Sequence, residues 1–403
     1  MPGGALEGIR VVELGQLVSA PYCAKLFSDF GADIVKVEPP SGDLARKWGP
    51  FPNDEPHPEK SGLFHFLNTN KNSITLDVDA PEGRELFLRL IADADVLIEN
   101  NPPPLTRQRR LDYETLAEYN PNLVVISITP FGQTGPYCDW KGYDLNAFHL
   151  SAAGHRYCGR PGEAPLEHGT FSADFYGAVT AAAWGLAAVM GRDHVGGGQL
   201  VDVSCAEAIA ATFVGGQTIG GLAQNKIYDR RTGIGMGLSA PAAIIPCKDG
   251  HVWMLVLEVG QWRSLVRAMD SPEWAQLEMF EDKVIRGQNK DLIYPLVEEW
   301  TMQYGKQEIM DRCQAEGAPV TAVLTVEEVA QHPHLRAREY FVELDHPVLG
   351  KVADLGAPFK LPACPGGPRS AAPLLGQHND LVLRERLGLS DEELRRLVAD
   401  GIV

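Results

Sequence analysis

The first 38 residues alternate strand, helix and strand, and this pattern constrains the fold more than any other stretch. Residues 8–15 (GIRVVELG) are rich in β-branched side chains, and residues 21–31 (PYCAKLFSDFG) form a helical pattern that ends at Gly31. Residues 32–38 (ADIVKVE) read as a second strand. Two strands joined through a helix lie parallel in one sheet. The opening therefore predicts an α/β fold with a Rossmann-like, doubly wound parallel sheet.

The same alternation continues to about residue 210, with further strands expected at 73–77, 95–100, 123–131 and 200–203. After glycines at 215–221, residues 241–260 read as two strands joined at a Lys-Asp-Gly turn, and amphipathic helices follow. A chain of 403 residues is long enough for two domains. We expect a large domain at 1–224, a small α+β domain at 225–325, and a return to the large domain at 326–403.

Several common catalytic motifs are absent. The turn after the first strand, GQLVSAP, lacks the Gly-x-Gly-x-x-Gly of a dinucleotide site, so no NAD is expected. No Gly-x-Ser-x-Gly, phosphate loop or His-Glu-x-x-His occurs. These absences make an acid-centred mechanism relatively more favoured, without establishing one.

Charge and cysteine content limit the partners and the compartment. The 53 acidic residues against 36 Lys plus Arg give a net charge of −17, which argues against nucleic acid or an anionic membrane. Seven cysteines are scattered without a Cys-x-x-Cys pair, which is typical of reduced thiols in a cytoplasmic protein without a metal site. The N-terminus shows no leader pattern, and no uncharged run reaches the length of a membrane span.

A single acid, Asp174, stands between Glu167 and Asp193, at the start of an Ala-rich helical run. From Phe175 to Met190 there is no Pro and no charge, so we expect this helix to be buried and closely packed. The helix N-terminus favours a negative charge, so the carboxylate should stay ionised at neutral pH. Asp174 is therefore a candidate nucleophile. An ordinary helix N-cap looks the same, and this segment alone favours the cap.

A series of segments in fixed order resembles a known family. VVELGQLVSAP is followed by VKVEPPSGDLAR, LNTNK, DVLIEN, FGQTGP…KGYD, the helix at Asp174 with GGGQLVDVS, IIPCKDGHVWM, RAREYF and APLLGQHND. Each piece alone is weak evidence, but their order and spacing cover almost the whole chain. Together they resemble the class III CoA-transferases, the family of carnitine and formyl-CoA transferases, whose scaffold is shared by α-methylacyl-CoA racemases.

The resemblance implies an enzyme that moves CoA from a thioester, possibly succinyl-CoA, to a free carboxylic acid. Asp174 matches the family's catalytic aspartate, which forms anhydride and thioester intermediates, and the match reverses the preference for a cap. Coenzyme A would be a substrate, and no permanently bound cofactor is implied. The family's subunits form interlocked dimers, so a homodimer, or a heteromer with a related subunit, is expected.

The resemblance also implies CoA contacts, in the loop after the first strand, the Asn-x-Asn-Lys segment, the end of the Ile-Glu-Asn strand and a Lys before Tyr-Asp. Two departures matter: Glu99–Pro104 replaces the family's Glu-Asn-Phe-Arg-Pro-Gly, and Gln108 stands where an Arg is usual, so Arg107 or Arg109 would supply the charge. Each cation could equally be a solvated surface residue, and Asn68 and Asn70 could be turn formers. The matching positions are Leu17, Val18, Leu67, Asn68, Asn70, Lys71, Asn100, Asn101, Arg107, Arg109 and Lys141.

The acceptor acid is less constrained. The glycine-rich lid of formyl-CoA transferase matches Glu258–Gln261, where Gly260 is the only glycine, so a carnitine-like, dicarboxylic or aromatic acid is favoured over formate or oxalate. Tyr143, Glu258 and Gly260 are candidate substrate contacts, although Glu258 could simply end a strand. An acyl pocket, or plain core, could include Phe171, Phe175, Tyr176, Trp184 and Met236.

Two alternatives stay open. An α-methylacyl-CoA racemase needs a second base, and the family's racemases carry Gly-His-Asp where this chain has Gly142-Tyr143-Asp144. A CoA-binding subunit without activity of its own would not need Asp174.

Overall fold

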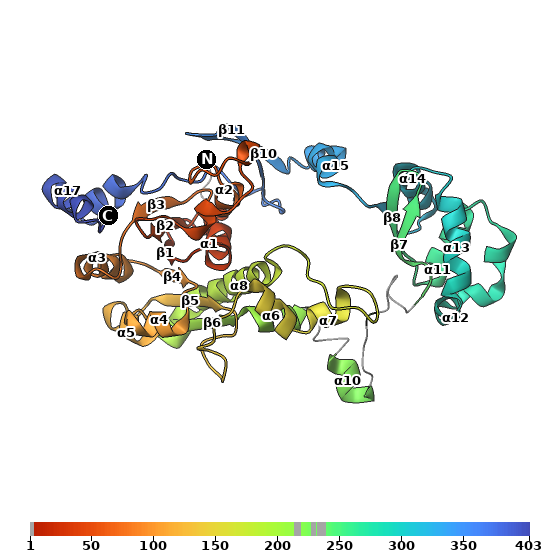
Figure 1. Cartoon of the computed structure of the whole chain (residues 1–403), viewed down its shortest axis with the longest axis horizontal. Coiled ribbons are helices and arrows are strands. Elements are labelled where there is room, and N and C mark those ends of the chain that lie inside the picture. The colour runs from red at the N-terminus through yellow and green to blue at the C-terminus, as the bar shows by residue number, and fades with distance from the viewer. Residues whose placement is uncertain (1–3, 213–218, 227–230, 232–238) are drawn as a thin grey trace. The chain divides into compact units, whose positions relative to one another are not determined.

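The structure is a computed structural model that describes residues 4–212, 219–226, 231 and 239–403. Its chain forms two compact units. The larger unit has the bounds Met1–Cys158, Leu166–Asp229 and Arg336–Val403, and the smaller has Gly159–Pro165 and Arg230–Leu335. Figure 1 labels the helices and strands of both units.

A parallel sheet of six strands forms the centre of the larger unit, in the order β3-β2-β1-β4-β5-β6. This order is that of doubly wound dinucleotide-binding sheets, so the parallel α/β fold predicted from the first 38 residues is confirmed. Both faces of the sheet are covered, so even polar strand residues such as Glu13, Lys36 and Ser73 are buried among the apolar ones. The bounds of the strands are β1 (Arg10–Leu14), β2 (Asp33–Glu38), β3 (Asn72–Thr75), β4 (Val96–Glu99), β5 (Val124–Thr129) and β6 (Leu200–Ser204).

Helices pack on both faces of this sheet (Figure 1). One face carries α1 (Ser19–Asp29), α8 (Ser172–Val195) and α9 (Cys205–Ile209). The other carries α3 (Pro81–Ala92), α5 (Tyr113–Tyr119), a π-helical segment (Asp380–Arg386) and α17 (Asp391–Ala399). Pro81 stands at the first position of α3, where its missing N–H costs nothing. The unit's shorter helices are α2 (Gly62–Leu67), α4 (Pro103–Gln108), α6 (Asp144–Leu150), α7 (Ala153–Tyr157) and α10 (Gly220–Asn225).

Helix α8 is buried on one face only. A Cβ atom on Gly185 would lie 2.1 Å from Ile126 Cδ1, so this face touches the sheet closely, as expected. The opposite face exposes Val179, Trp184 and Met190, whose accessible fractions are 50%, 65% and 73%. The expectation of a buried, closely packed helix therefore holds for the face against the sheet and is wrong for the opposite face. Among the described residues α8 is also the one helix with the length and apolar character of a membrane span, and core helices commonly share that character.

The C-terminal segment returns to the edge of the sheet. The backbone N–H groups of Ser73 and Thr75 in β3 donate to His378 Nδ1 at 3.1 Å and to Asn379 Oδ1 at 2.9 Å. This segment covers the edge of strand β3, which would otherwise present unpaired backbone groups. It is preceded by an antiparallel hairpin, β10 (Phe341–His346) and β11 (Gly350–Leu355).

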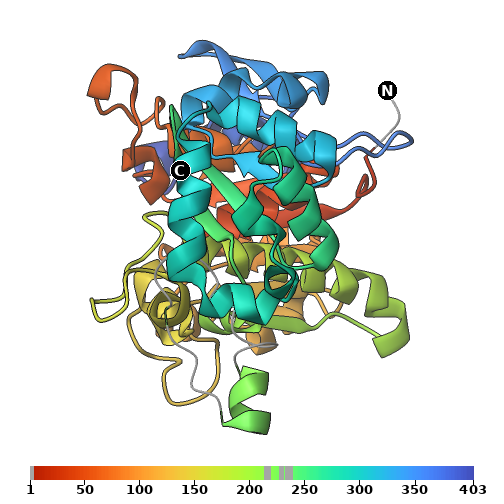
Figure 2. The ribbon, with the colours of Figure 1, turned by 90° about the vertical axis from the view of Figure 1, so that its right-hand side faces the viewer.

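The smaller unit packs helices against an antiparallel sheet with its own apolar core. Its strands are β7 (Ala242–Cys247), β8 (Gly250–Leu255) and β9 (Val320–Ala322), and β7 and β8 meet at the expected Lys-Asp-Gly turn. In Figure 2 the helices in teal lie over the green strands. The helices are α11 (Val259–Ala268), α12 (Lys283–Gln288), α13 (Lys290–Thr301) and α14 (Lys306–Glu316), followed along the chain by α15 (Val326–Gln331) and α16 (Pro333–Ala337).

Candidate active site

The strand order changes direction between β1 and β4, and open α/β sheets bind ligands outside the carboxyl ends of the strands at such a point. Here Asn100, directly after β4, bonds the loop after β1. Its Oδ1 accepts from the backbone N–H of Gln16 at 2.9 Å, and its Nδ2 donates to the carbonyl of Gln16 at 2.8 Å. These bonds bring four of the predicted CoA-contact residues to one edge of the sheet: Leu17, Val18, Asn100 and Asn101.

The segment that ends in Lys71 lies inside the larger unit. The side chains of Leu67, Asn68 and Lys71 are all buried. Lys71 Nζ donates to the carbonyl of Pro21 at 2.8 Å and to Asn68 Oδ1 at 2.9 Å, and pairs with Glu13 at 2.8 Å. Burial lowers the pKa of the Lys71 ammonium to about 8, against the opposing pull of the Glu13 carboxylate. The ammonium therefore points at protein groups, and its contact with CoA stays a prediction.

Asn70 forms a turn that ties this segment to the C-terminal part of the chain. Its φ is +65°, in the left-handed region that Asn tolerates better than most residues. Its Oδ1 accepts from the backbone N–H groups of Arg369 at 2.6 Å and Ser370 at 3.0 Å.

Cations stand at the rim of the same edge. Arg107 forms an ion pair with Asp139, which places the end of α4 beside the stretch that contains the exposed Lys141. Arg109 is held by both oxygens of Asp79, at 2.7 and 2.6 Å. Exposed pairs of this kind are weak, so Arg107 can exchange its partner for a phosphate at little cost.

Asp174 occupies the third position of α8, since the helix begins at Ser172 with Phe171 before it. No bond from its carboxyl to a backbone N–H of the helix is found in the described part of the chain. The capping role is instead played by a second acid. Asp144, at the start of α6, accepts the backbone N–H of Asp174 on Oδ1 at 2.9 Å. The Asp174 carboxyl therefore makes no capping hydrogen bond to α8, and the alternative that Asp174 is the N-cap residue was wrong.

The two acids lie close enough for their charges to repel. Burial, and secondly the Asp144 carboxylate, raise the pKa of Asp174 to about 7. Burial also raises the pKa of Asp144, although its hydrogen bonds from Asp174 and Ala173 oppose this. Burial and the neighbouring Asp144 charge both favour the neutral carboxyl, and so oppose the expected ionisation of Asp174 at neutral pH. A carboxyl that titrates near 7 can act as a nucleophile or exchange a proton.

Aromatic rings flank the start of α8. The ring of Phe175 meets that of Tyr22 edge-on with 4.8 Å between centroids, and Phe171 meets Trp48 at 5.5 Å. Tyr176 is half-buried against the core, whereas Trp184 is exposed. Two of the predicted acyl-pocket residues, Phe171 and Phe175, therefore lie beside Asp174 in sequence and in space, and Met236 lies outside the described residues.

The remaining candidates are surface residues. Tyr143 is 74% exposed and precedes α6. In the smaller unit, Glu258 is the N-cap residue of α11, and the side chain of Gln261 accepts its backbone N–H at 3.0 Å. Gly260 lies in the first turn of the same helix, and a Cβ there would meet no atom within 4 Å. In the described part of the chain no cluster of three or more His, Cys, Asp or Glu side chains is placed to hold a metal.

The sequence reasoning gave no role to Asp144, Trp48 or Tyr22. Asp144 was named only as part of Gly142-Tyr143-Asp144, and its hydrogen-bond partner Asp174 is 30 residues away along the chain. The rings carried no signal, because aromatic residues are common in any core.

The chain is similar to known proteins along almost its whole length. The family model described as CoA-transferase family III matches residues 6–379. A succinyl-CoA–D-citramalate CoA-transferase from Chloroflexus aurantiacus is 32% identical over 100% of this chain and 99% of its own length. A formyl-CoA:oxalate CoA-transferase from Streptomyces coelicolor is 33% identical over the full length of both chains. A crystal structure of a CAIB/BAIF family protein from Brucella suis superposes with a TM-score of 0.84 at 30% identity, covering 95% of this chain and 99% of that one.

Proposed function

The chain belongs to CoA-transferase family III, and from that premise we propose that Asp174 is the nucleophile that carries the transferred group. The observation that supports this most is that the carboxyl of Asp174 makes no capping hydrogen bond at the start of α8. Asp144 accepts the backbone N–H there instead. Partial burial supports the role as well, because water would hydrolyse an acyl anhydride.

The proposed reaction uses one carboxylate twice. Asp174 attacks the acyl carbon of the donor thioester, forming a mixed anhydride and releasing CoA thiolate. The thiolate attacks the aspartyl carbonyl, which releases the first acid and leaves an aspartyl-CoA thioester. The acceptor carboxylate then displaces the thiolate to form a second anhydride. Attack of the thiolate on the acceptor's acyl carbon gives the new acyl-CoA and restores the Asp174 carboxylate.

We place coenzyme A along the carboxyl edge of β1 and β4. The partly exposed Leu17 and Asn100 lie at this edge, and Arg107 and Lys141 offer exposed charges for phosphates. These contacts would give an acidic protein the local cations that a polyanionic substrate needs.

For the reacting acids, we propose a succinyl-CoA donor and a dicarboxylic acceptor. Support comes from the relative named for D-citramalate and from the aromatic side chains beside Asp174, which favour an organic acid larger than formate. The thiols of Cys23, Cys138, Cys205, Cys247, Cys313 and Cys364 form no disulfide, which is consistent with the cytoplasmic location we propose.

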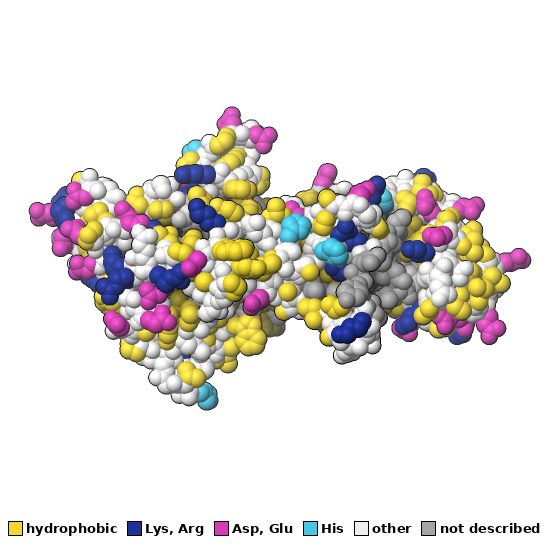
Figure 3. Space-filling view, turned by 60° about the horizontal axis from the view of Figure 1, so that its bottom comes forward, with side chains coloured by type: hydrophobic (Ala, Val, Ile, Leu, Met, Phe, Trp, Pro, Cys, Tyr) yellow, Lys and Arg dark blue, Asp and Glu magenta, His cyan; other side chains and the backbone are white. Residues whose placement is uncertain are grey.

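We also propose that the enzyme is a dimer. The apolar residues exposed on α8 would be covered by a second subunit, since soluble proteins rarely leave such a surface open to water. Figure 3 shows hydrophobic side chains (yellow) reaching the surface of the larger unit over a broad area.

The test is to trap the aspartyl intermediate. The protein is incubated with labelled succinyl-CoA and then hydroxylamine, and peptide mass spectrometry is used to find a hydroxamate. We expect it at Asp174, and we expect Asp174→Asn to lower the transfer rate by about a thousand-fold or more. Asp193→Asn changes an exposed acid on the same helix and should leave the rate as in the parent.

Each alternative predicts a different result. A racemase would exchange the proton beside the thioester for solvent deuterium without forming a hydroxamate. A non-catalytic subunit would bind CoA and do neither. Undiminished transfer by Asp174→Asn would refute the proposed nucleophile.

A further inference from the structure

Four buried charges lie beneath the loop that follows β1. Lys36 Nζ pairs with Glu13 Oε1 at 2.7 Å and with Asp43 Oδ2 at 2.6 Å, and Lys71 Nζ pairs with Glu13 Oε2 at 2.8 Å. All four side chains have 0% accessible surface. Two cations and two anions balance, so each charge has the partner of opposite sign that a buried charge requires.

This cluster holds the backbone of the loop at two points. Lys36 Nζ donates to the carbonyl of Gly15 at 3.1 Å, and Asp43 Oδ1 accepts the backbone N–H of Leu17 at 2.9 Å. Leu17 has a φ of +65°, a conformation that a branched residue adopts only when its surroundings impose it. The bond to Asp43 is such a constraint, and it leaves the outer side of the loop available.

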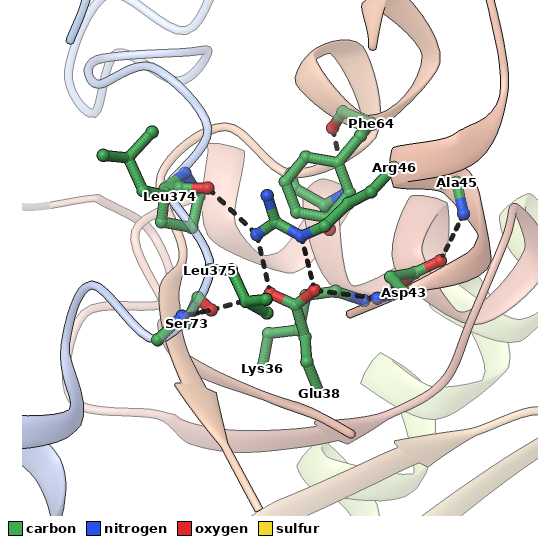
Figure 4. A network of polar contacts seen from close by, with 12 residues as sticks. Lys36, Glu38, Asp43, Ala45, Arg46, Phe64, Ser73, Leu374 and Leu375 are labelled. Atoms are coloured by element: carbon green, nitrogen blue, oxygen red, sulfur yellow. Dashed lines mark hydrogen bonds and ion pairs between the residues drawn. The ribbon is translucent and has the colours of Figure 1, made fainter. Parts of the chain in front are cut away.

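Asp43 is itself held in place by its neighbours. Its Oδ1 also accepts the N–H of Ala45 at 2.7 Å, and its own N–H donates to Glu38 Oε2 at 3.0 Å. The guanidinium of Arg46 donates two hydrogen bonds to the same Glu38 carboxylate, at 2.7 and 2.8 Å. Figure 4 shows this arrangement. The carboxyl of Asp43 is therefore fixed relative to β2 before any ligand arrives.

From this geometry we infer that Asp43 is a positioning residue for coenzyme A binding, acting through Leu17. Its side chain is buried and cannot touch the ligand, but it holds the loop in the conformation that presents the partly exposed Leu17 at the sheet edge, while Val18 is fully buried beneath it. The inference rests on the proposed placement of CoA at this loop. It also assigns the charge cluster to positioning of that loop, while phosphate contact falls to the exposed rim cations Arg107 and Lys141.

Loss of this constraint should appear as weaker binding. If the freed loop holds the binding conformation for only a tenth of the time, the apparent dissociation constant rises about ten-fold. The chemical step at Asp174 would be unchanged once CoA is bound.

The experiment compares two substitutions that remove the same charge. Asp43→Ala abolishes the acceptor for Leu17, whereas Asp43→Asn keeps an oxygen in its place. The affinity for coenzyme A is measured by titration calorimetry at a temperature where circular dichroism shows both variants to be folded. We expect Asp43→Ala to bind about ten-fold more weakly than the parent, and Asp43→Asn to bind within about three-fold of it.

A matched control lies at the other end of β1. Asp95 accepts the backbone N–H of Arg10 at 2.9 Å and pairs with Arg192 at 2.9 Å, so Asp95→Ala removes a backbone hydrogen bond and an ion pair away from the proposed site. We expect it to leave CoA affinity unchanged. If Asp43→Ala does not fold, the charge-balanced variant Asp43→Ala/Lys36→Met replaces it, with the same ten-fold loss expected.

Equal affinities of Asp43→Ala and the parent would overturn the inference, as would equal losses in the Ala and Asn variants, because the charge alone would then matter. Either result leaves the proposed function intact if the parent still forms the hydroxamate at Asp174. A parent that binds no CoA would overturn the proposed placement and this inference together.

Discussion

At the scale of single residues, the feature that matters most is the pair of acids at the start of α8. Asp144 bonds the backbone of Asp174 and so frees its carboxyl, while its negative charge helps to raise the pKa of that carboxyl to about 7. Because the pKa of an acid raised in this way lies above its unfolded value, ionisation destabilises the fold. The protonated Asp174 therefore contributes to the free energy of unfolding, a contribution that is complete below about pH 4 and is lost as the pH rises through 7.

The pH dependence of hydroxamate formation tests this pair. Only the carboxylate attacks an acyl carbon, so the rate should rise with pH to a plateau, with a midpoint near 7. Asp144→Asn keeps the acceptor for Asp174 but removes the charge, so its midpoint should move to lower pH. Asp112→Asn, which changes an acid that caps α5, should leave the midpoint unaltered. A midpoint near 4 in the parent would contradict the raised pKa.

At the scale of elements, α8 shows how small residues let a helix approach a sheet. Gly177 and Gly185 lie on its buried face, where a Cβ would come within 2.6 Å of Cys205 Sγ and 2.1 Å of Ile126 Cδ1 respectively. Gly191 lies on the same helix, yet a Cβ there would meet nothing within 4 Å. Position on the helix therefore decides whether glycine is needed.

Two glycine substitutions on α8 should have opposite effects on stability. Gly185→Ala overpacks the contact with Ile126 and should lower the free energy of unfolding by about 1–3 kcal/mol. Gly191→Ala removes backbone freedom from a helical position with open space and should raise it by roughly 0.5–1 kcal/mol. Urea denaturation of the two variants and the parent provides the measurement. The same sign for both would show that the close contact has no energetic weight.

In the whole molecule, hydrogen bonds between distant parts of the chain hold the larger unit together, and one of its surfaces exposes apolar residues that a second subunit would cover. Asn379 bonds Thr75 in β3 across 304 residues of sequence, so the C-terminal segment completes a sheet that the N-terminal half begins. The exposed face of α8 in contrast has no cover within the described residues, and its Trp184 and Met190 are large enough to anchor an interface.

Charges placed on this face should separate the proposed dimer. Trp184→Glu/Met190→Glu should raise the dissociation constant by roughly 30-fold or more, because buried aromatic anchors dominate binding and an unpaired charge opposes burial. Light scattering after size exclusion reports the mass. Val398→Glu, on the exposed side of α17, is the control and should stay dimeric. A monomeric parent at micromolar concentration would contradict the proposed assembly.

Much of the fold followed from local pattern. The parallel strands, α8 and the β7–β8 turn are encoded in periodicity, glycines and prolines a few residues apart, so each is readable without the rest of the chain. Asp174 was singled out in the same way, as a lone acid before an apolar run, and the family resemblance then gave it a role. The exposed face of α8 was missed because composition alone does not reveal what covers a helix.

The alternation of strands and helices, the acidic balance and the position of one unusual carboxyl can all be read from the amino-acid sequence. The raised pKa of that carboxyl comes from its burial and from an acid 30 residues away, and the burial of Lys71 in a charge cluster with Glu13 likewise depends on contacts between distant segments. The physical reason is that pattern reports local conformation. Burial and electrostatic interaction depend instead on distances between segments that folding alone brings together.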